Sequence, residues 1–221
     1  MKLCIQAILK FLMGILLVGV LIFVPAGTLR FANGWLLMGV LFAPVIALGV
    51  VLFVKNPALL AARLNGKEKQ REQDLVVKLS GLMFVAGFVL AGLTHRFGWY
   101  RLPMGVCVGA VVVLLAAYGM YAEVLRENAY LSRTVQVQAG QTVVDTGLYG
   151  IVRHPMYSAT LILFLAMPLV LGSLYAFAVF LLYPLLIVRR IRQEERLLER
   201  ELDGYRAYQQ KVRYRLIPFV W

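Results

Sequence analysis

Long apolar runs separated by short polar segments make up most of this chain. Each of the first four runs is long enough, or nearly so, to cross the roughly 30 Å hydrocarbon layer of a membrane as a helix. The fifth run is too long for one straight span, and Gly172-Ser173 interrupts it near its middle. We therefore expect an all-α, polytopic membrane bundle of about six passes, the last two forming a helical hairpin. The runs cover residues 11–27, 35–54, 79–94, 104–122 and 156–188.

The composition also favours a membrane protein and argues against a single soluble core. Of the 221 residues, 61% are hydrophobic and 15% are charged, whereas soluble domains are about 45–50% apolar and about 25% charged. The net charge of +12 fits the excess of Lys and Arg in cytoplasmic loops, which also meet anionic headgroups. Membrane lipids are therefore expected partners, and nucleic acid is not. Cys4 and Cys107 lie far apart in apolar surroundings, so no metal site or disulfide is predicted.

The distribution of basic residues predicts how the chain lies in the membrane. Lys and Arg gather near the N-terminus, in the polar segments 55–78 and 126–153, and in the C-terminal tail, whereas the alternate loops carry only Arg30, and Arg96 with Arg101. By the positive-inside rule, both termini and both long segments are cytoplasmic. No A-x-A cleavage site follows the first apolar run, so we expect a retained span rather than a signal peptide. In a bacterium this multi-pass protein would lie in the inner (plasma) membrane.

Two further patterns concern packing and transport. Gly105 and Gly109 form a G-x-x-x-G pair in the fourth run, which predicts close helix packing there. No internal repeat is evident, and few polar residues lie in mid-span, so an inverted-repeat transporter is not supported.

Polar residues concentrate in the last hundred positions, beginning with the segment 132–157. Valine and polar residues alternate in its first part, which indicates extended chain, and Asp145-Thr146-Gly147 indicates a turn. Pro155 is expected as a first helical residue, with Arg153-His154 just before it. One interpretation is an ordinary loop with interfacial aromatics and positive-inside charges. The other is that exposed N–H groups and cations at this helix start bind an anionic or hydroxyl-rich ligand.

A second polar stretch, 187–208, has the periodicity of an amphipathic helix leaving the membrane. Glu194 and Glu195 lie close to its apolar stripe, and Arg190 stands four residues before Glu194. Arg190 and Glu194 could form a helix i, i+4 pair worth a few tenths of a kcal/mol. Alternatively, because acids at the membrane boundary are costly unless paired or used, they could belong to a functional site. The stripe consists of Ile187, Ile191, Leu198, Leu202 and Tyr205.

Taken together, these stretches resemble the isoprenylcysteine carboxyl methyltransferase family, integral membrane enzymes that are similar to the phospholipid N-methyltransferases. The resemblance covers roughly 130–221, and the earlier spans match only in being hydrophobic. The matching residues are Gly147-x-Tyr149-x-x-Val152-Arg153-His154-Pro155-Met156-Tyr157, then Arg190, Glu194-Glu195, Gly204-Tyr205-x-x-Tyr208, and Val212-Arg213-Tyr214-Arg215-Leu216-Ile217-Pro218.

The resemblance implies S-adenosyl-L-methionine as methyl donor, bound in a cytoplasm-facing pocket made by the loop, the hairpin and the C-terminal helix. It divides the chain into N-terminal transmembrane helices (1–128) and a catalytic region (129–221). Arg190 would orient the substrate, Glu194 would contact the reacting end, and Glu195 is the third expected catalytic residue. The family often has a His near position 141, where this chain has Gln. The expected cofactor residues are Gln138 or Gln136, Gln141, Thr142, Val143, Val144, Tyr149, Arg153, His154, Pro155, Met156 and Tyr157.

The expected activity is methylation of the carboxylate of an isoprenylcysteine-like or other amphipathic lipid substrate, with no obligate protein partner. A carboxylate is ionised at neutral pH and needs no general base, whereas an amine acceptor would need Glu194 as its base. The first alternative is therefore an aminophospholipid N-methyltransferase. A non-catalytic membrane scaffold or small transporter is another, and related membrane reductases use a nicotinamide cofactor. No G-x-G-x-G follows a strand, so no Rossmann module is expected.

Overall fold

The computed structural model describes residues 2–64, 71–131 and 137–221. About 76% of the chain is helical, and the described residues contain no strand. Five helical segments are long and apolar enough to cross a membrane, and α6 adds a shorter apolar pass, which confirms the predicted all-α polytopic bundle. The helices are α1 (Lys2–Ala26), α2 (Ala32–Lys55), α3 (Pro57–Leu64), α4 (Arg71–Arg96), α5 (Met104–Glu127), the 3-10 turn η1 (Gly147–Gly150), α6 (Pro155–Val170), α7 (Leu174–Phe180), α8 (Tyr183–Glu201) and α9 (Tyr205–Lys211).

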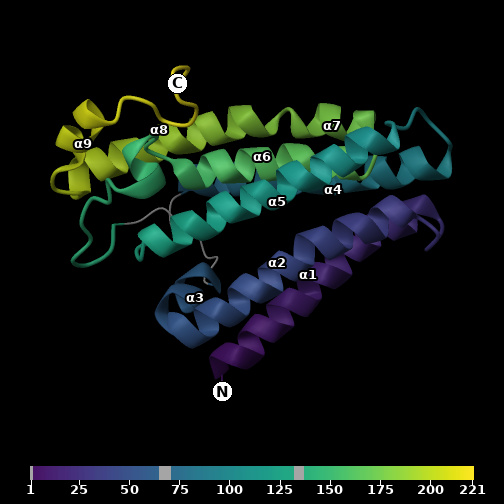
Figure 1. Cartoon of the computed structure of the whole chain (residues 1–221), viewed down its shortest axis with the longest axis horizontal. Helices are drawn as coiled ribbons and strands as arrows, with labels where there is room; N and C mark the ends of the chain where they lie inside the picture. The colour runs from purple at the N-terminus through teal and green to yellow at the C-terminus, as the bar shows by residue number, and fades with distance from the viewer. Residues whose placement is uncertain (1, 65–70, 132–136) are drawn as a thin grey trace.

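The long helices run up and down, so the loops alternate between two ends of the bundle (Figure 1). Both termini, α3, the segment that follows α5, and α9 lie at one end, which we call the site end. The connections α1–α2, α4–α5 and α6–α7 lie at the other, which we call the hairpin end (Figure 1). The two ends of the chain and the two long polar segments thus share a side, as the basic residues predicted. That this side is cytoplasmic stays a prediction.

The buried core is formed by α4, α5, α6, α7 and α8 together with the adjoining parts of α1 and α2. Small side chains let α5 and α6 pack along each other, because they allow the two backbones to approach; Ala110 and Ala117 of α5 and Ala159 and Ala166 of α6 are all buried. Larger side chains fill the remaining space, and Phe180 of α7 is fully buried. Many residues of α1 and α2 stay exposed, as suits helices that face lipid.

Glycine packing differs from the prediction. A Cβ at Gly105 or Gly109 would meet nothing within 4 Å, so this pair makes no close helix contact. The close approach occurs at Gly92 of α4 instead, where a Cβ would lie 2.5 Å from the carbonyl oxygen of Ile22 in α1. The G-x-x-x-G spacing failed because it marks a flat surface without showing whether another helix lies against it.

The hairpin end is closed by neutral polar groups. Gly172 turns the chain with φ +72°, and the Ser173 hydroxyl accepts a hydrogen bond from the Ala176 N–H (3.1 Å), which caps α7. The Ser173 and Thr94 hydroxyls share a second bond (2.9 Å). Asn33 Nδ2 donates to the Val170 carbonyl (3.0 Å). These bonds confirm the predicted break at Gly172-Ser173 and fix the hairpin onto α2 and α4.

The predicted amphipathic helix over 187–208 is broken in the structure. Helix α8 ends at Glu201, and α9 begins at Tyr205 after a short turn. Gly204 adopts φ +80°, a left-handed conformation that glycine takes without steric cost and that a continuous helix cannot contain. The break turns α9 back toward the loop before α6, and this positions its two tyrosines at the site.

Candidate functional site

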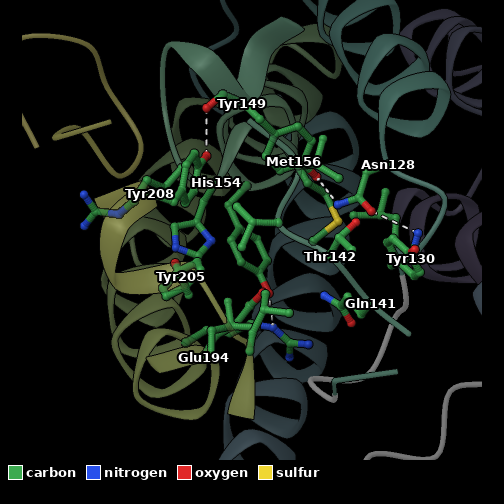
Figure 2. A pocket seen from close by; sticks show the side chains of 18 residues that line it. Asn128, Tyr130, Gln141, Thr142, Tyr149, His154, Met156, Glu194, Tyr205 and Tyr208 are labelled. Carbon is green, nitrogen blue, oxygen red and sulfur yellow. Dashed lines mark hydrogen bonds between the residues drawn. The ribbon is translucent and has the colours of Figure 1, made fainter. Parts of the chain in front are cut away.

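A cavity opens at the site end between two walls (Figure 2). Helices α8 and α9 carry Glu194, Tyr205 and Tyr208 on one side, and the segment after α5 carries Tyr130 and Gln141 on the other (Figure 2). The start of α6 lies between them. The lining residues are Asn128, Tyr130, Leu131, Gln141, Thr142, Val143, Val144, Tyr149, Arg153, His154, Met156, Tyr157, Arg190, Glu194, Leu198, Leu202, Tyr205 and Tyr208.

Tyr157 joins the two predicted catalytic residues of α8. Its hydroxyl donates to Glu194 Oε2 (2.6 Å) and accepts from Arg190 Nε (2.8 Å). The Arg190 guanidinium also lies 5.9 Å from the centre of the Tyr157 ring. The Tyr157 hydroxyl of α6 therefore bridges the side chains of Arg190 and Glu194, which are four residues apart on α8. Because Tyr157 is buried, the bridge holds both charged groups at the cavity wall.

Glu195 lies at the centre of a buried cluster that we call the glutamate clamp, formed with Arg153, His154 and Arg215. Arg153 Nε donates to Oε1 (2.7 Å), and Arg215 Nε donates to Oε2 (2.7 Å). His154 Nε2 lies 3.3 Å from Oε1. The side chains of Arg153 and Glu195 are only 5% and 4% exposed. Glu195 does not line the cavity, so its position suits holding the site together rather than touching a reacting group.

The C-terminal tail packs along the start of α6. The N–H groups of Arg153 and His154 donate to the carbonyls of Tyr214 and Arg215 (both 2.9 Å). Arg153 Nη1 donates to two further tail carbonyls, those of residues 212 and 213 (2.8 Å each). The tail therefore occupies the N–H groups of positions 153 and 154, and the expectation that this helix start binds an anionic or hydroxyl-rich ligand stays a prediction. Pro155 does begin α6, as predicted.

Tyrosines form the wall opposite the loop. The Tyr208 hydroxyl donates to the Tyr149 carbonyl (2.7 Å), and Asn128 Nδ2 donates to the Tyr149 hydroxyl (2.9 Å). Burial raises the pKa of Tyr149 to about 12, although the bond from Asn128 opposes that shift. Tyr205 and Tyr208 pack at 5.8 Å between ring centres. The Tyr205 hydroxyl is buried and has no hydrogen-bond partner in the part of the chain that the structure describes.

The loop wall is shaped by its own hydrogen bonds. Gln138 Nε2 donates to the Tyr130 carbonyl (2.6 Å), and the Gln138 N–H donates to Gln141 Oε1 (2.9 Å). The Tyr130 hydroxyl donates to the Gly140 carbonyl (3.1 Å). Gln138 therefore supports the loop and does not line the cavity, whereas Gln141 does. Gln136, the other candidate, lies outside the described residues.

The structure brings most of the predicted site residues to one cavity. Gln138, Pro155 and Glu195 are not part of its lining. The residues that sequence reasoning missed fall into two groups. Leu198, Leu202, Tyr205 and Tyr208 were visible as an apolar stripe or a family motif but not as site residues. Asn128, Tyr130 and Leu131 follow a helix end and carry no pattern of their own. The functional roles of all these residues stay predictions.

A bundle of membrane-length helices with a charged and aromatic cavity at one end defines a polytopic membrane protein with a candidate site at that end. Residues 108–200 match the model of the isoprenylcysteine carboxyl methyltransferase (ICMT) family. This region, which runs from within α5 to the last turn of α8, is similar to that family, and the predicted resemblance is confirmed. The match contains the loop, η1, α6 and both charged residues bridged by Tyr157.

One curated relative belongs to a reductase class. The chain is 30% identical over 136 residues to a Delta(14)-sterol reductase of Mus musculus, and the aligned part is 54% of this chain and 32% of that protein. The chain thus spans about a third of the length of this relative. The similarity agrees with the expectation that membrane reductases are related to this chain.

Proposed function

We propose that the protein is a membrane-embedded S-adenosyl-L-methionine-dependent methyltransferase acting on the carboxylate of an isoprenylcysteine-like or other amphipathic lipid. The observation that carries the proposal is the Arg190–Tyr157–Glu194 bridge, which lies in the lining of the cavity and inside the family-matched region. It puts a cation and a carboxylate side by side at the membrane boundary. The positive-inside rule supports a cytoplasmic position for this end.

The residues of the cavity fit such a donor. S-adenosyl-L-methionine supplies an activated methyl group on a sulfonium cation, together with a nucleoside and an amino acid. The Glu194 carboxylate and the tyrosine rings suit a cation, because both attract positive charge. The Tyr205 hydroxyl is a buried polar group without a partner among residues 2–64, 71–131 and 137–221, which is rare unless a ligand or water supplies one. The residues that would hold the donor are Gln141, Thr142, Val143, Val144, Tyr149, His154, Met156 and Tyr157.

Arg190 would bind the acceptor. A guanidinium donates charge-assisted hydrogen bonds to a carboxylate in a fixed geometry. The bond from its Nε to Tyr157 fixes the guanidinium at the cavity wall and limits the rotamers it can adopt. The acceptor carboxylate is already ionised at neutral pH. Rate enhancement would therefore come from holding the acceptor oxygen in line with the methyl group and from excluding water.

The position of Glu194 also supports an aminophospholipid N-methyltransferase as a second candidate. Glu194 lines the cavity, and one of its oxygens accepts from Tyr157. An ammonium acceptor must lose a proton before it attacks a methyl group, and a carboxylate in the cavity could accept that proton. The two candidate functions differ only in the acceptor group of the lipid that would face Arg190 and Glu194, a carboxylate in one and an amine in the other.

Calorimetric titration of the purified protein in detergent with S-adenosyl-L-methionine tests the donor, and NADPH serves as the competing ligand. We expect binding of the first and not of the second. The His154→Ala variant should weaken donor binding, while Glu199→Gln, an exposed change on α8, should leave it unchanged. Binding of NADPH alone would favour reductase chemistry, and binding of neither would favour a non-catalytic scaffold.

Mass analysis of lipids incubated with methyl-labelled donor identifies the acceptor. A methyl increment on a carboxylate lipid would support the first candidate, and an increment on an aminophospholipid would support the second. A donor-binding protein that labels no lipid would contradict both.

A further inference from the structure

Tyr205 stands out among the tyrosines that line the cavity. It is the first residue of α9, the residue is only 4% exposed, and its hydroxyl has no partner among the described residues. The hydroxyls of Tyr130, Tyr149, Tyr157 and Tyr208 all make hydrogen bonds within the protein. The missing bond therefore belongs to one position and is not a general property of this wall.

A buried hydroxyl without a partner costs free energy, because it has lost its bonds to water and gained none. Phenylalanine would fill the same space without that cost. Tyr205 also belongs to the lining of the cavity, beside Glu194 and His154 (Figure 2). A ligand that reaches its buried hydroxyl would supply the hydrogen bond that the described part of the protein does not provide.

The surroundings of Tyr205 restrict what that occupant can present. Burial raises the pKa of Tyr205, and the charges of Glu195 and Glu194 add to this effect, so the hydroxyl stays protonated and can donate. Of the two acids only Glu194 lines the cavity, and its charge disfavours a ligand carboxylate next to it. The tilted ring pair of Tyr205 and Tyr208 provides an aromatic corner, and aromatic side chains stack well on nucleobases.

We propose that the Tyr205 hydroxyl forms a hydrogen bond with the uncharged nucleoside part of the methyl donor, at a ribose hydroxyl or a ring nitrogen of the base. This inference rests on the proposed function and deepens it, because it assigns the α9 wall to the nucleoside and leaves the reacting end to Tyr157, Arg190 and Glu194. Tyr205 is then a contact for donor binding rather than part of the hydrophobic core.

Two matched variants in one helix test the assignment: Tyr205→Phe and Tyr208→Phe. Without ligand, Tyr205→Phe should melt at the same temperature as the wild type or slightly above it, because the change removes an unpartnered hydroxyl. Tyr208→Phe should melt lower, because it deprives the Tyr149 carbonyl of its donor. Thermal unfolding in detergent measures both changes.

Calorimetry with two probes then locates the contact. S-adenosylhomocysteine carries the nucleoside and the amino acid, whereas methylthioadenosine carries the nucleoside without the carboxylate. Tyr205→Phe should weaken both probes by the same factor, about two- to tenfold, as expected for one neutral hydrogen bond.

Each contrary result has a distinct meaning. If the wild type binds both probes and Tyr205→Phe binds them equally well, the Tyr205 hydroxyl makes no hydrogen bond to the nucleoside. The proposed function is then unaffected. A loss confined to S-adenosylhomocysteine places the hydroxyl on the amino acid part and overturns the nucleoside assignment. A large fall in the ligand-free melting temperature of Tyr205→Phe shows that the hydroxyl serves the fold. If the wild type binds neither probe, the proposed function fails and this inference fails with it.

Discussion

The polar side chains that join helices inside the hairpin end of the bundle are small and neutral, whereas the buried ones at the site end include charged groups. At the hairpin end, Asn33, Thr94 and Ser173 each have a partner in the protein, and their bonds join helices. At the site end, Glu195 accepts from two guanidinium groups, and the Tyr205 hydroxyl has no partner in the portion of the chain that the structure describes. The difference teaches that polarity alone does not distinguish a packing group from a candidate ligand contact. What distinguishes them is whether the polar group already has a hydrogen-bond partner in the protein.

The two ends should also respond differently to substitution. Neutral hydrogen bonds contribute about 0.5–1.5 kcal/mol each to stability. Removing one partner of a buried ion pair costs about 3–5 kcal/mol, because a buried charge is left uncompensated. The site end is therefore the more fragile of the two, although it contains the site that ligands are expected to stabilise.

The largest effect is expected from Glu195→Ala. The substitution leaves the buried Arg153 guanidinium without its carboxylate and frees Arg215 from the clamp. The free energy of unfolding should fall by about 3 kcal/mol or more, as seen in denaturant or thermal unfolding in detergent. Glu199→Ala is the matched control, since Glu199 is exposed on the same helix and should change stability little. Equal free energies of unfolding for Glu195→Ala and Glu199→Ala would contradict a stabilising role of the glutamate clamp.

The next effect concerns Arg190→Ala, which should reduce the rate of methyl transfer on the order of 100-fold, because the acceptor is no longer held in line with the methyl group. Donor affinity should change much less. Arg190→Lys keeps the charge but loses the planar fork, so it should restore only part of the rate. Steady-state kinetics and calorimetry on the same preparations separate the two quantities. Equal losses of rate and donor affinity would argue against substrate orientation.

A smaller effect is expected at the hairpin end from Ser173→Ala. The change removes the cap of α7 and the partner of Thr94, and should cost about 1–2 kcal/mol. Because the hairpin end lies away from the cavity, donor affinity measured by calorimetry should stay at the wild-type value (Figure 1). If Ser173→Ala changed donor affinity as much as a variant at the site end does, the two ends would not have the separate roles inferred for them.

The smallest effect is expected from Asp145→Asn. The hydrogen bond and the charge of Lys211 lower the pKa of Asp145 from its ordinary 3.8, and the pair joins the loop to α9. A lowered folded-state pKa gives stability that is present above the unfolded-state value and is lost as the pH falls through the folded-state value. Both groups are exposed, so the contribution is small. Melting temperatures at pH 7 should differ slightly between wild type and variant and should converge near pH 2.

The sequence predicted the architecture well because apolar length dictates membrane spans. The hairpin break at Gly172-Ser173, the start of α6 at Pro155 and the common side of both termini all followed from local patterns. The set of residues around the cavity was largely predicted as well, but through family resemblance rather than through periodicity. Gln141 to Val144 carry no local signal that would place them opposite α8.

Contacts between distant segments could not be predicted. Arg153 looked like a ligand contact, yet its guanidinium serves Glu195 and the tail, which lies about sixty residues away in the chain. Glu194 and Glu195 are neighbours in sequence but face different surroundings, because successive helical residues point about 100° apart. The turn at Gly204 was also missed, since the apolar stripe continues through it and hides the change of direction.

The docking of residues 212–216 onto the start of α6 makes the cavity wall depend on a few residues of the tail. The carbonyls of Tyr214 and Arg215 receive the N–H groups of positions 153 and 154, and those of residues 212 and 213 receive the Arg153 guanidinium. A chain shortened to end before residue 212 would keep every membrane-length helix and lose these four acceptors. We expect such a chain to enter the bilayer with the start of α6 unsupported.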